Sequence, residues 1–335
     1  MEVTERRVFA LDDGSRPGEV RRAASSLASR LGAGDTDAGR VALIATEAAT
    51  NAVKHARDGE MLLYGMRHDD AWTVGMVTID RGPGMRDVTA SLRDGVSTAG
   101  SPGTGLGAIR RLASTFDVHS GPGGTAVLAE VHGGTNGRAT AFEVGVLRVP
   151  CAGEEACGDD CAVVGTDEGR CAILLVDGLG HGVAAASAAE EATRLFRARP
   201  TDGPEAILAM LHDGLRGTRG AAAAVAEIDP RRGRVRFAGV GNVAGTLCAD
   251  GTMRSMVSQH GTLGHRASRF HGFTYPWSAN AVVVLHSDGL SSRWDLGAYP
   301  GLAGRHPMLI AGVLYRDFAR RTDDASVVVL REAAA

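Results

Sequence analysis

The fold of the second half of the chain is decided by residues 171–198, CAILLVDGLGHGVAAASAAEEATRLFRA. Its first part, Cys171–Asp177, is a short apolar run of strand length, and its last part, Val183–Ala198, fits a helix. The junction Asp177-Gly178-Leu179-Gly180-His181-Gly182 places a carboxylate where the strand ends and the helix begins. An isolated Asp-Gly is more often a simple turn, so a site is indicated only if other acidic groups accompany it.

Acidic residues also flank other strands that we predict in this half of the chain. Asp159-Asp160 lies at the start of one strand, Asp288-Gly289 follows Ala281–Ser287, and Asp323-Asp324 precedes Ala325–Leu330. Carboxylates at strand ends can converge over one edge of a sandwich, and such a group suits Mg²⁺ or Mn²⁺ better than zinc. Two such ions, about 3.5–4 Å apart, can generate hydroxide and stabilise in-line attack on phosphorus.

A polar, glycine-rich segment, His132–Arg138, divides the chain. We therefore predict an α/β (α+β) protein of two domains, residues 1–134 and 138–335. The first reads as strand, two helices, hairpin, loop, helix and strand. The second is rich in strands, with helices at Val183–Ala198, Gly203–Arg216 and Pro307–Arg320, and should form a layered sandwich.

One predicted helix of the first domain, Thr36–Ala56, carries a polar face. Glu47, Asn51 and Lys54 fall at i, i+4 and i+7, roughly opposite an apolar face that includes Val41 and Ala45. Carboxylate and amide oxygens suit Mg²⁺, and a lysine adds positive charge near phosphate. A solvated helix face is the alternative interpretation of these three residues.

Two glycine-rich segments follow this helix. Asp80-Arg81-Gly82-Pro83-Gly84 ends a predicted strand, where the aspartate can accept a hydrogen bond from an exocyclic amine such as that of adenine. Gly103-Thr104-Gly105-Leu106-Gly107 opens a predicted helix that continues to Phe116, and glycine-rich backbone at a helix start is suited to anions. The P-loop pattern is missing, so this would be a different kind of nucleotide site.

Composition excludes several classes of protein. A formal net charge of −3 gives no basic surplus for nucleic acid. No apolar run approaches the roughly 18 residues of a membrane span, and the first residues lack the apolar core of a signal peptide. We expect a cytoplasmic protein that binds neither nucleic acid nor membrane. The five cysteines fit free thiols, with a zinc site at Cys151, Cys157 and Cys161 as the alternative.

The motifs of the first domain resemble the N, G1 and G2 boxes of the GHKL ATPases. The matching positions are Glu47-xxx-Asn51-xxx-His55, Asp80-x-Gly82-x-Gly84 and Gly103-x-Gly105-x-Gly107, in that order. Within that superfamily the domain is similar to the bacterial serine/threonine switch kinases that act on sigma-factor regulators. Asp94–Thr98 resembles the stressosome switch kinase in particular.

This resemblance implies a Bergerat α/β sandwich that binds ATP and Mg²⁺. Asn51 would hold Mg²⁺, Glu47 would activate the attacking hydroxyl as the catalytic base, and Asp80 would read adenine. The implied ATP-binding residues are Asn51, Lys54, Asp80, Gly82, Gly84, Gly103, Thr104, Gly105, Leu106, Gly107 and Thr125.

The acidic motifs of the second domain resemble those of the metal-dependent protein phosphatases (PPM), in the SpoIIE-like branch that includes the stressosome feedback phosphatase. This resemblance implies a four-layer α-β-β-α sandwich. Asp177 would bridge two Mn²⁺ or Mg²⁺ ions with help from the Gly178 carbonyl, and Asp159, Asp288 and Asp323 would complete the ligands. Asp160 and Asp324 are the alternatives to Asp159 and Asp323. His181 would donate a proton to the leaving serine or cap the following helix.

Together the two resemblances imply a fused serine/threonine kinase and phosphatase. We expect its substrates to be STAS-domain proteins, either anti-anti-sigma factors or stressosome scaffold proteins, and its partners to include a sigma-factor regulator. Two alternatives stay open. The first domain could hold ATP mainly to bind a partner, and the second could be a degenerate phosphatase fold that acts as a sensor.

Overall fold

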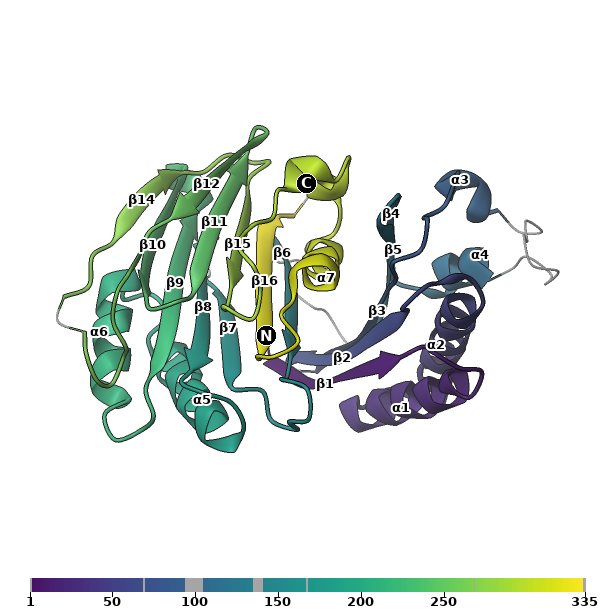
Figure 1. The fold of residues 1–335 in the computed structure, drawn as a ribbon, viewed down its shortest axis with the longest axis horizontal. Coiled ribbons are helices and arrows are strands. Elements are labelled where there is room, and N and C mark those ends of the chain that lie inside the picture. Colours follow the sequence, from purple (N-terminus) through teal and green to yellow (C-terminus); the bar gives the residue numbers. More distant parts are fainter. Residues whose placement is uncertain are drawn as a thin grey trace. The chain divides into compact units, whose positions relative to one another are not determined.

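The computed structural model describes residues 2–68, 70–93, 105–134, 141–166, 168–267 and 269–333, with side chains of residues 2–5 and 68 left aside (Figure 1). By their contacts the residues form two compact units. The first comprises Met1–Arg138 with Tyr299–Arg316, and the second comprises Ala139–Ala298 with Asp317–Ala335. The domain boundaries 1–134 and 138–335 remain a prediction, and they differ from the compact units at Tyr299–Arg316.

The first unit is built on a five-stranded antiparallel sheet in the order β1-β2-β3-β5-β4 (Figure 1). The predicted hairpin is present, since β2 pairs with β3 from Glu60 opposite Ile79 to His68 opposite Ala71. The strands are β1 (Glu2–Ala10), β2 (Glu60–His68), β3 (Ala71–Ile79), β4 (Thr115–Gly121) and β5 (Gly124–Gly133).

Helices cover one face of this sheet, namely α1 (Arg16–Leu31), α2 (Asp35–His55) and α4 (Gly105–Leu112), while α3 (Val88–Ser91) is a single turn. The apolar face of α2 that the sequence predicts is buried: Val41, Ala45, Ala48 and Ala52 pack into one core with sheet residues such as Met76. Because one side of α2 is used for this core, its opposite side is left for the polar residues Glu47, Asn51 and Lys54.

One predicted element of this unit was wrong. The helix expected to continue to Phe116 ends at Leu112, and Thr115–Gly121 forms β4 instead. Phe116 lies four residues after Leu112 and so continues the helical spacing of apolar residues, which is why the sequence favours a longer helix. In the structure Thr115 and Phe116 pair with Glu130 and Ala129 of β5, and this ladder outweighs the local pattern.

Tyr299–Arg316, which the contacts place in the first unit, includes η3 (Leu302–Gly304) and most of α7 (Pro307–Phe318). Asp117 of β4 accepts hydrogen bonds from Nη1 of Arg305 (3.2 Å) and from the backbone N–H of His306 (2.8 Å). A methyl group on Gly312 would lie 3.0 Å from Cγ1 of Val77. Val77 points away from α1 and α2, since Met76 faces them, so this segment contacts the opposite face of the sheet.

The second unit contains two sheets, in the orders β13-β10-β9-β8-β7, with β14 paired to β10, and β12-β11-β15-β16-β6. Neighbouring strands are antiparallel except β10 and β13. The strands are β6 (Phe142–Val149), β7 (Asp159–Gly165), β8 (Cys171–Gly178), β9 (Ala221–Asp229), β10 (Arg234–Val240), β11 (Ala244–Ala249), β12 (Thr252–Met256), β13 (Ser258–Gln259), β14 (Phe273–Pro276), β15 (Val282–His286) and β16 (Ala325–Glu332).

The sheets pack face to face, and helices cover the outer face of the first. A methyl group on Gly245 of β11 would lie 2.8 Å from the ring of Phe237 of β10, so these two sheets are in contact. On the other face, Phe196 of α5 (Val183–Ala198) and Leu208 of α6 (Pro204–Gly214) share a core with Val225 of β9. This accounts for three of the four layers expected, whereas most of α7 belongs to the first unit. Short 3-10 turns occur at η1 (Pro230–Arg232) and η2 (Leu296–Ala298).

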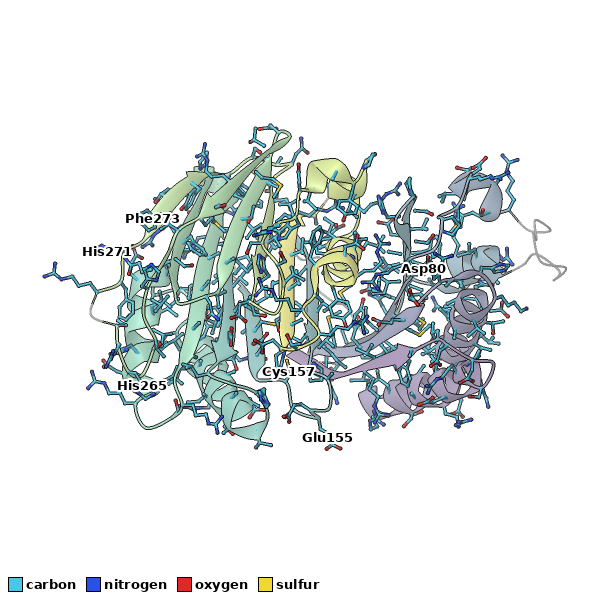
Figure 2. All side chains as sticks on the ribbon, viewed as in Figure 1. Asp80, Glu155, Cys157, His265, His271 and Phe273 are labelled. Carbon is cyan, nitrogen blue, oxygen red and sulfur yellow. The ribbon has the colours of Figure 1, made fainter. Side chains whose placement is uncertain are left out.

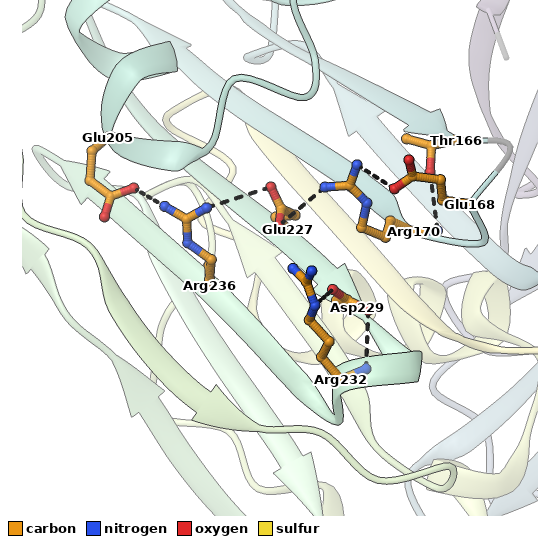
Figure 3. Close-up of polar contacts among 8 residues, drawn as sticks. All are labelled: Thr166, Glu168, Arg170, Glu205, Glu227, Asp229, Arg232 and Arg236. Carbon is orange, nitrogen blue, oxygen red and sulfur yellow. Dashed lines mark hydrogen bonds and ion pairs between the residues drawn. The ribbon is translucent and has the colours of Figure 1, made fainter.

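A line of charged side chains crosses the helix-covered face of the first sheet (Figure 3). Glu227 of β9 is 5% exposed and lies 3.8 Å from Nη1 of Arg170 and 3.9 Å from Nη1 of Arg236. Arg236 also pairs with Glu205 of α6 at 2.8 Å, and Arg170 with Glu168 at 2.8 Å. These pairs tie α6 and neighbouring strands together, which holds in place the sheet that carries Asp159 and Asp177.

The helices of the described residues include none that combines the length and the apolar character needed to cross a bilayer.

Candidate functional site

The polar face of α2 lies beside the start of α4. Glu47 and Asn51 are half-buried and Lys54 is exposed. Nδ2 of Asn51 is buried without a hydrogen-bond partner, and a methyl group on Gly105 would lie 2.7 Å from it. A buried amide group without a partner is costly unless a ligand or water satisfies it, so Asn51 fits a residue that binds phosphate or a hydrated cation.

Asp80, labelled in Figure 2, directly follows β3. It is hydrogen-bonded to two other predicted site residues. Its Oδ1 accepts hydrogen bonds from the backbone N–H groups of Gly82 (2.7 Å) and Thr125 (3.3 Å), and Nη1 of Arg316 donates to its backbone oxygen at 3.2 Å. Burial raises the pKa of the Asp80 carboxyl above its usual range. The second oxygen, Oδ2, has no hydrogen bond to the described residues, so it can accept one from a ligand amine.

The glycines near Asp80 are required by close backbone packing. Gly84 has φ +76°, and a side chain there would overlap the carbonyl of Gly121. Of the predicted phosphate-binding segment, Gly103 and Thr104 lie outside the described residues, whereas Gly105, Leu106 and Gly107 form the first turn of α4. The structure thus brings Asn51 to Gly105, and Asp80 to Gly82 and Thr125.

In the second unit, Asp159 and Asp177 face each other across β7 and β8, since they are direct partners in the register of these strands. Asp159 is 1% exposed, and Oδ2 of each carboxylate is buried with no hydrogen-bond partner. Burial raises the pKa of both groups well above the usual range, and for Asp177 the nearby carboxylates of Asp159, Asp288, Asp323 and Asp324 add to it. The predicted acidic motifs therefore converge at one edge of the sandwich.

The two alternatives left open by the sequence differ in their surroundings. Asp160 is engaged elsewhere, because its oxygens accept hydrogen bonds from Arg148 and, at 2.7 Å, from Thr193 Oγ1. Both oxygens of Asp324 are also occupied, by the backbone N–H groups of Cys151 (2.8 Å) and Gly158 (2.9 Å). Asp160 and Asp324 are thus hydrogen-bonded within the protein, and the choice of Asp159 and Asp323 as metal ligands stays a prediction.

Asp288 and its neighbours complete the acidic edge. Oδ2 of Asp288 accepts a hydrogen bond from Nδ2 of Asn242, and a side chain at Gly289 would overlap the carbonyl of Asp324. His286, two residues before Asp288, is 1% exposed. Its Nδ1 lies 2.8 Å from the Ser287 carbonyl and its Nε2 accepts from Trp294 Nε1 (3.4 Å), so the ring is neutral with its proton on Nδ1. Burial lowers the pKa of His286.

The donor set fits a hard divalent cation. Carboxylate oxygens buried without donors are unfavourable on their own and are satisfied by a metal ion. Among the described residues, no three His, Cys, Asp or Glu side chains are drawn together tightly enough to form a ready-made ligand group, so the ligand assignments stay predictions. All five cysteines are free thiols.

Sequence reasoning missed two residues of this site. Glu154 lies 2.7 Å from Nδ1 of His181, and Asn242 contacts Asp288. Glu154 lies in the loop between β6 and β7, where no sequence pattern marks it, whereas Asn242 stands in the turn between β10 and β11. The alternative role of His181 as a cap is not observed, because the N-cap residue of α5 is Gly182 and no side chain caps this helix.

Comparison with known proteins matches each half of the chain to a different family. Residues 13–130 match the model of the histidine kinase-like ATPase domain, and residues 167–332 match that of stage II sporulation protein E (SpoIIE). Over 111 residues the chain is 30% identical to the serine/threonine-protein kinase RsbT of Bacillus subtilis (strain 168), covering 33% of this chain and 84% of RsbT.

Two solved structures resemble the chain over 57% of its length. One, from work on the bacterial stressosome as a modular system adapted to control secondary messenger signalling, is 30% identical with a TM-score of 0.53 and is covered over 99% of its chain. The other, RsbX in complex with magnesium, is 21% identical with a TM-score of 0.52 and is covered over 96%, which shows the fold alone. The chain therefore belongs to the histidine kinase-like ATPases, as a relative of RsbT, in its N-terminal part and to the SpoIIE family of PPM phosphatases in its C-terminal part.

Proposed function

We propose that this chain is a bifunctional regulator of a partner-switching pathway, which phosphorylates and dephosphorylates serine or threonine residues of STAS-domain proteins. The observation that carries the phosphatase half is the pair Asp159 and Asp177, whose unpartnered oxygens lie among further carboxylates. The kinase half is supported by Asn51 beside Gly105 and by the link of Asp80 to Thr125.

In the kinase half, each residue has a chemical role. Asp80 accepts a hydrogen bond from the adenine amine, Asn51 holds the Mg²⁺ that accompanies ATP, and Lys54 adds positive charge near the phosphates. Bound Mg²⁺ neutralises charge on the phosphate oxygens. Glu47, one helical turn before Asn51, takes the proton of the attacking hydroxyl.

In the phosphatase half, Asp177 and the Gly178 carbonyl would hold two Mn²⁺ or Mg²⁺ ions, and Asp159, Asp288 and Asp323 would complete their ligands. When bound, the ions supply an activated water and stabilise charge on the phosphoryl group. Asn242 orients Asp288 through its hydrogen bond. His181, which contacts Glu154 at 2.7 Å, would donate a proton to the leaving serine or threonine oxygen in this proposal.

The partner assignment is supported by the names of the relatives. RsbT is a serine/threonine kinase, and one similar structure comes from the stressosome. We propose that the substrates are STAS-domain anti-anti-sigma or stressosome scaffold proteins, with a sigma-factor regulator as a further partner, and that the protein acts in the cytoplasm.

The test uses a purified STAS-domain protein in two steps. The full chain is incubated with it, ATP and Mg²⁺, and then ATP is removed and Mn²⁺ is added. We expect Asn51→Ala to abolish phosphorylation only and Asp177→Ala to abolish dephosphorylation only, so that each variant is the control for the other. ATP binding without phosphate transfer would instead indicate a partner-binding module. No Mn²⁺-dependent hydrolysis of any phosphate ester would indicate a degenerate phosphatase.

A further inference from the structure

A cation without an ion-pair partner among the described residues lies at the rim of the acidic cluster. Arg219 is in the loop between α6 and β9, and its side chain is exposed. A methyl group on Gly180 would lie 3.2 Å from Nη1 of Arg219, so the guanidinium lies against the loop that follows Asp177. No described carboxylate pairs with it, and Glu154, an acid of the β6–β7 loop that lies near Gly182, is engaged by His181 at 2.7 Å.

The backbone of Arg219 is fixed relative to this loop. The backbone N–H of Leu179 donates to the carbonyl of Gly220 at 3.0 Å, directly after Arg219. The carbonyl of Arg219 accepts a hydrogen bond from Nε2 of His265, also at 3.0 Å. The main chain therefore holds Arg219 in place, while its guanidinium is left available to a ligand.

The same loop packs on the acidic cluster. A methyl group on Gly158, the residue before Asp159, would lie 3.2 Å from the carbonyl oxygen of Gly180 and 2.7 Å from Oδ2 of Asp324. Gly180 thus lies beside the cluster on one side and beside Arg219 on the other. Gly180 therefore connects the guanidinium of Arg219 to the edge of the sandwich that carries Asp159 and Asp324.

A phosphate monoester is the ligand that fits these surroundings. Its oxygens carry negative charge that five neighbouring aspartates repel, and a planar guanidinium can bind two of them through parallel N–H···O hydrogen bonds. We propose that Arg219 binds the phosphoryl oxygens of the phosphoserine or phosphothreonine substrate and of the inorganic phosphate released, an inference that rests on the proposed phosphatase function.

Arg216 offers a matched control in the same loop. It is also an exposed arginine, but its Nη2 lies 3.1 Å from Oδ1 of Asp213. If any loss of positive charge in this loop weakened phosphate binding, Arg216→Ala would act like Arg219→Ala. If the position of the guanidinium matters, only Arg219→Ala has an effect.

The experiment measures hydrolysis of a phosphoserine peptide by the Mn²⁺-loaded full chain, together with calorimetric binding of inorganic phosphate. Loss of a charged hydrogen bond of about 1.5 kcal/mol corresponds to about tenfold in affinity. We therefore expect Arg219→Ala to raise KM for the peptide and Kd for phosphate each about tenfold, with kcat changed less. Arg219→Lys should retain part of the affinity, and Mn²⁺ binding should be unchanged in every variant.

Unchanged KM and phosphate Kd in Arg219→Ala would overturn the inference, as would an equal effect of Arg216→Ala. Loss of Mn²⁺ binding would also overturn it, because Arg219 would then support the metal site instead. If the unaltered chain does not hydrolyse the peptide, the proposed phosphatase function fails. The calorimetric arm still tests Arg219 in that case.

Discussion

Replacing Asp177 by asparagine should stabilise the metal-free protein while abolishing its response to Mn²⁺. Burial and the surrounding carboxylates raise the pKa of Asp177 to about 8, so its ionised form is unfavourable in the folded chain. The folded-state pKa lies above the unfolded one, so ionisation costs stability as pH rises above about 4. Asparagine keeps the shape of the side chain and removes this charge.

The size of the effect follows from the pKa shift. One pKa unit corresponds to about 1.4 kcal/mol. Asp177 and Asp159 titrate together, and a proton held by the pair relieves part of the repulsion between them. We therefore expect Asp177→Asn to raise the free energy of unfolding by about 1.5–3 kcal/mol at pH 7.5. For a unit of this size that raises the Tm by about 3–12 °C. Mn²⁺ at about 100 times its Kd should add about 2.7 kcal/mol to the unaltered chain and nothing to the variant.

Thermal melting with EDTA and with Mn²⁺ measures both effects. Asp213→Asn is the control, because Asp213 is an exposed carboxylate of the same unit, outside the acidic cluster, and should change neither Tm. A lower Tm of metal-free Asp177→Asn would refute the argument that the carboxylates repel one another. A Mn²⁺ response equal to that of the unaltered chain would refute Asp177 as a ligand.

Three further predictions concern other parts of the molecule. Gly105→Ala should weaken ATP binding at least about tenfold in calorimetry, because the added methyl group displaces Asn51. His286 is buried and neutral, because burial lowers its pKa. Its contribution to the stability of the fold is therefore present above about pH 6.5 and is lost as the pH falls below that value. Melting curves from pH 8 to 5.5 will record this loss. Tyr64→Phe removes the hydrogen bond, 2.5 Å long, that Tyr64 donates to the buried carboxylate of Glu130, and urea unfolding should show a loss of about 1.5–3 kcal/mol.

Each of these three predictions has a control variant that tests its physical reason. Gly39→Ala places the same methyl group in α2 with no atom within 4 Å, so it should leave ATP binding unchanged. His286→Phe should lose the pH-dependent part of the melting curve, and a curve identical to that of the unaltered chain would assign it to other histidines. Glu130→Gln combined with Tyr64→Phe should cost less than the sum of the two changes.

Much of the fold could be predicted because the apolar runs are regular. Cys171–Asp177 ends where β8 ends to within one residue, and Val183–Ala198 matches α5. β4 could not be predicted, since only its pairing with β5 distinguishes it from a longer helix. β12 was missed because most of its residues are exposed and carry no alternating apolar pattern.

The candidate sites show the same limit. The order of the motifs in the sequence predicts the acidic cluster and the polar face of α2. Adjacent aspartates in a strand point to opposite sides of the sheet, however, and the sequence does not say which side holds the site. Strand register answers this for Asp159, which lies opposite Asp177. The backbone donors that occupy Asp324 come from Cys151 and Gly158, at a distance along the chain that no local pattern can indicate.

The buried glutamate between two arginines has a consequence for how the first sheet of the second unit assembles. Glu227 lies directly opposite Arg236 in the pairing of β9 with β10. A slip of β9 by one residue would turn Glu227 toward the apolar space between the sheets, where no arginine could reach it. The same slip would move every residue of the alanine-rich strand Ala221–Ala226, whose small side chains alone distinguish poorly between registers. Glu227 thus favours a single register of β9, the one in which Ala222 lies opposite Asp177 of β8.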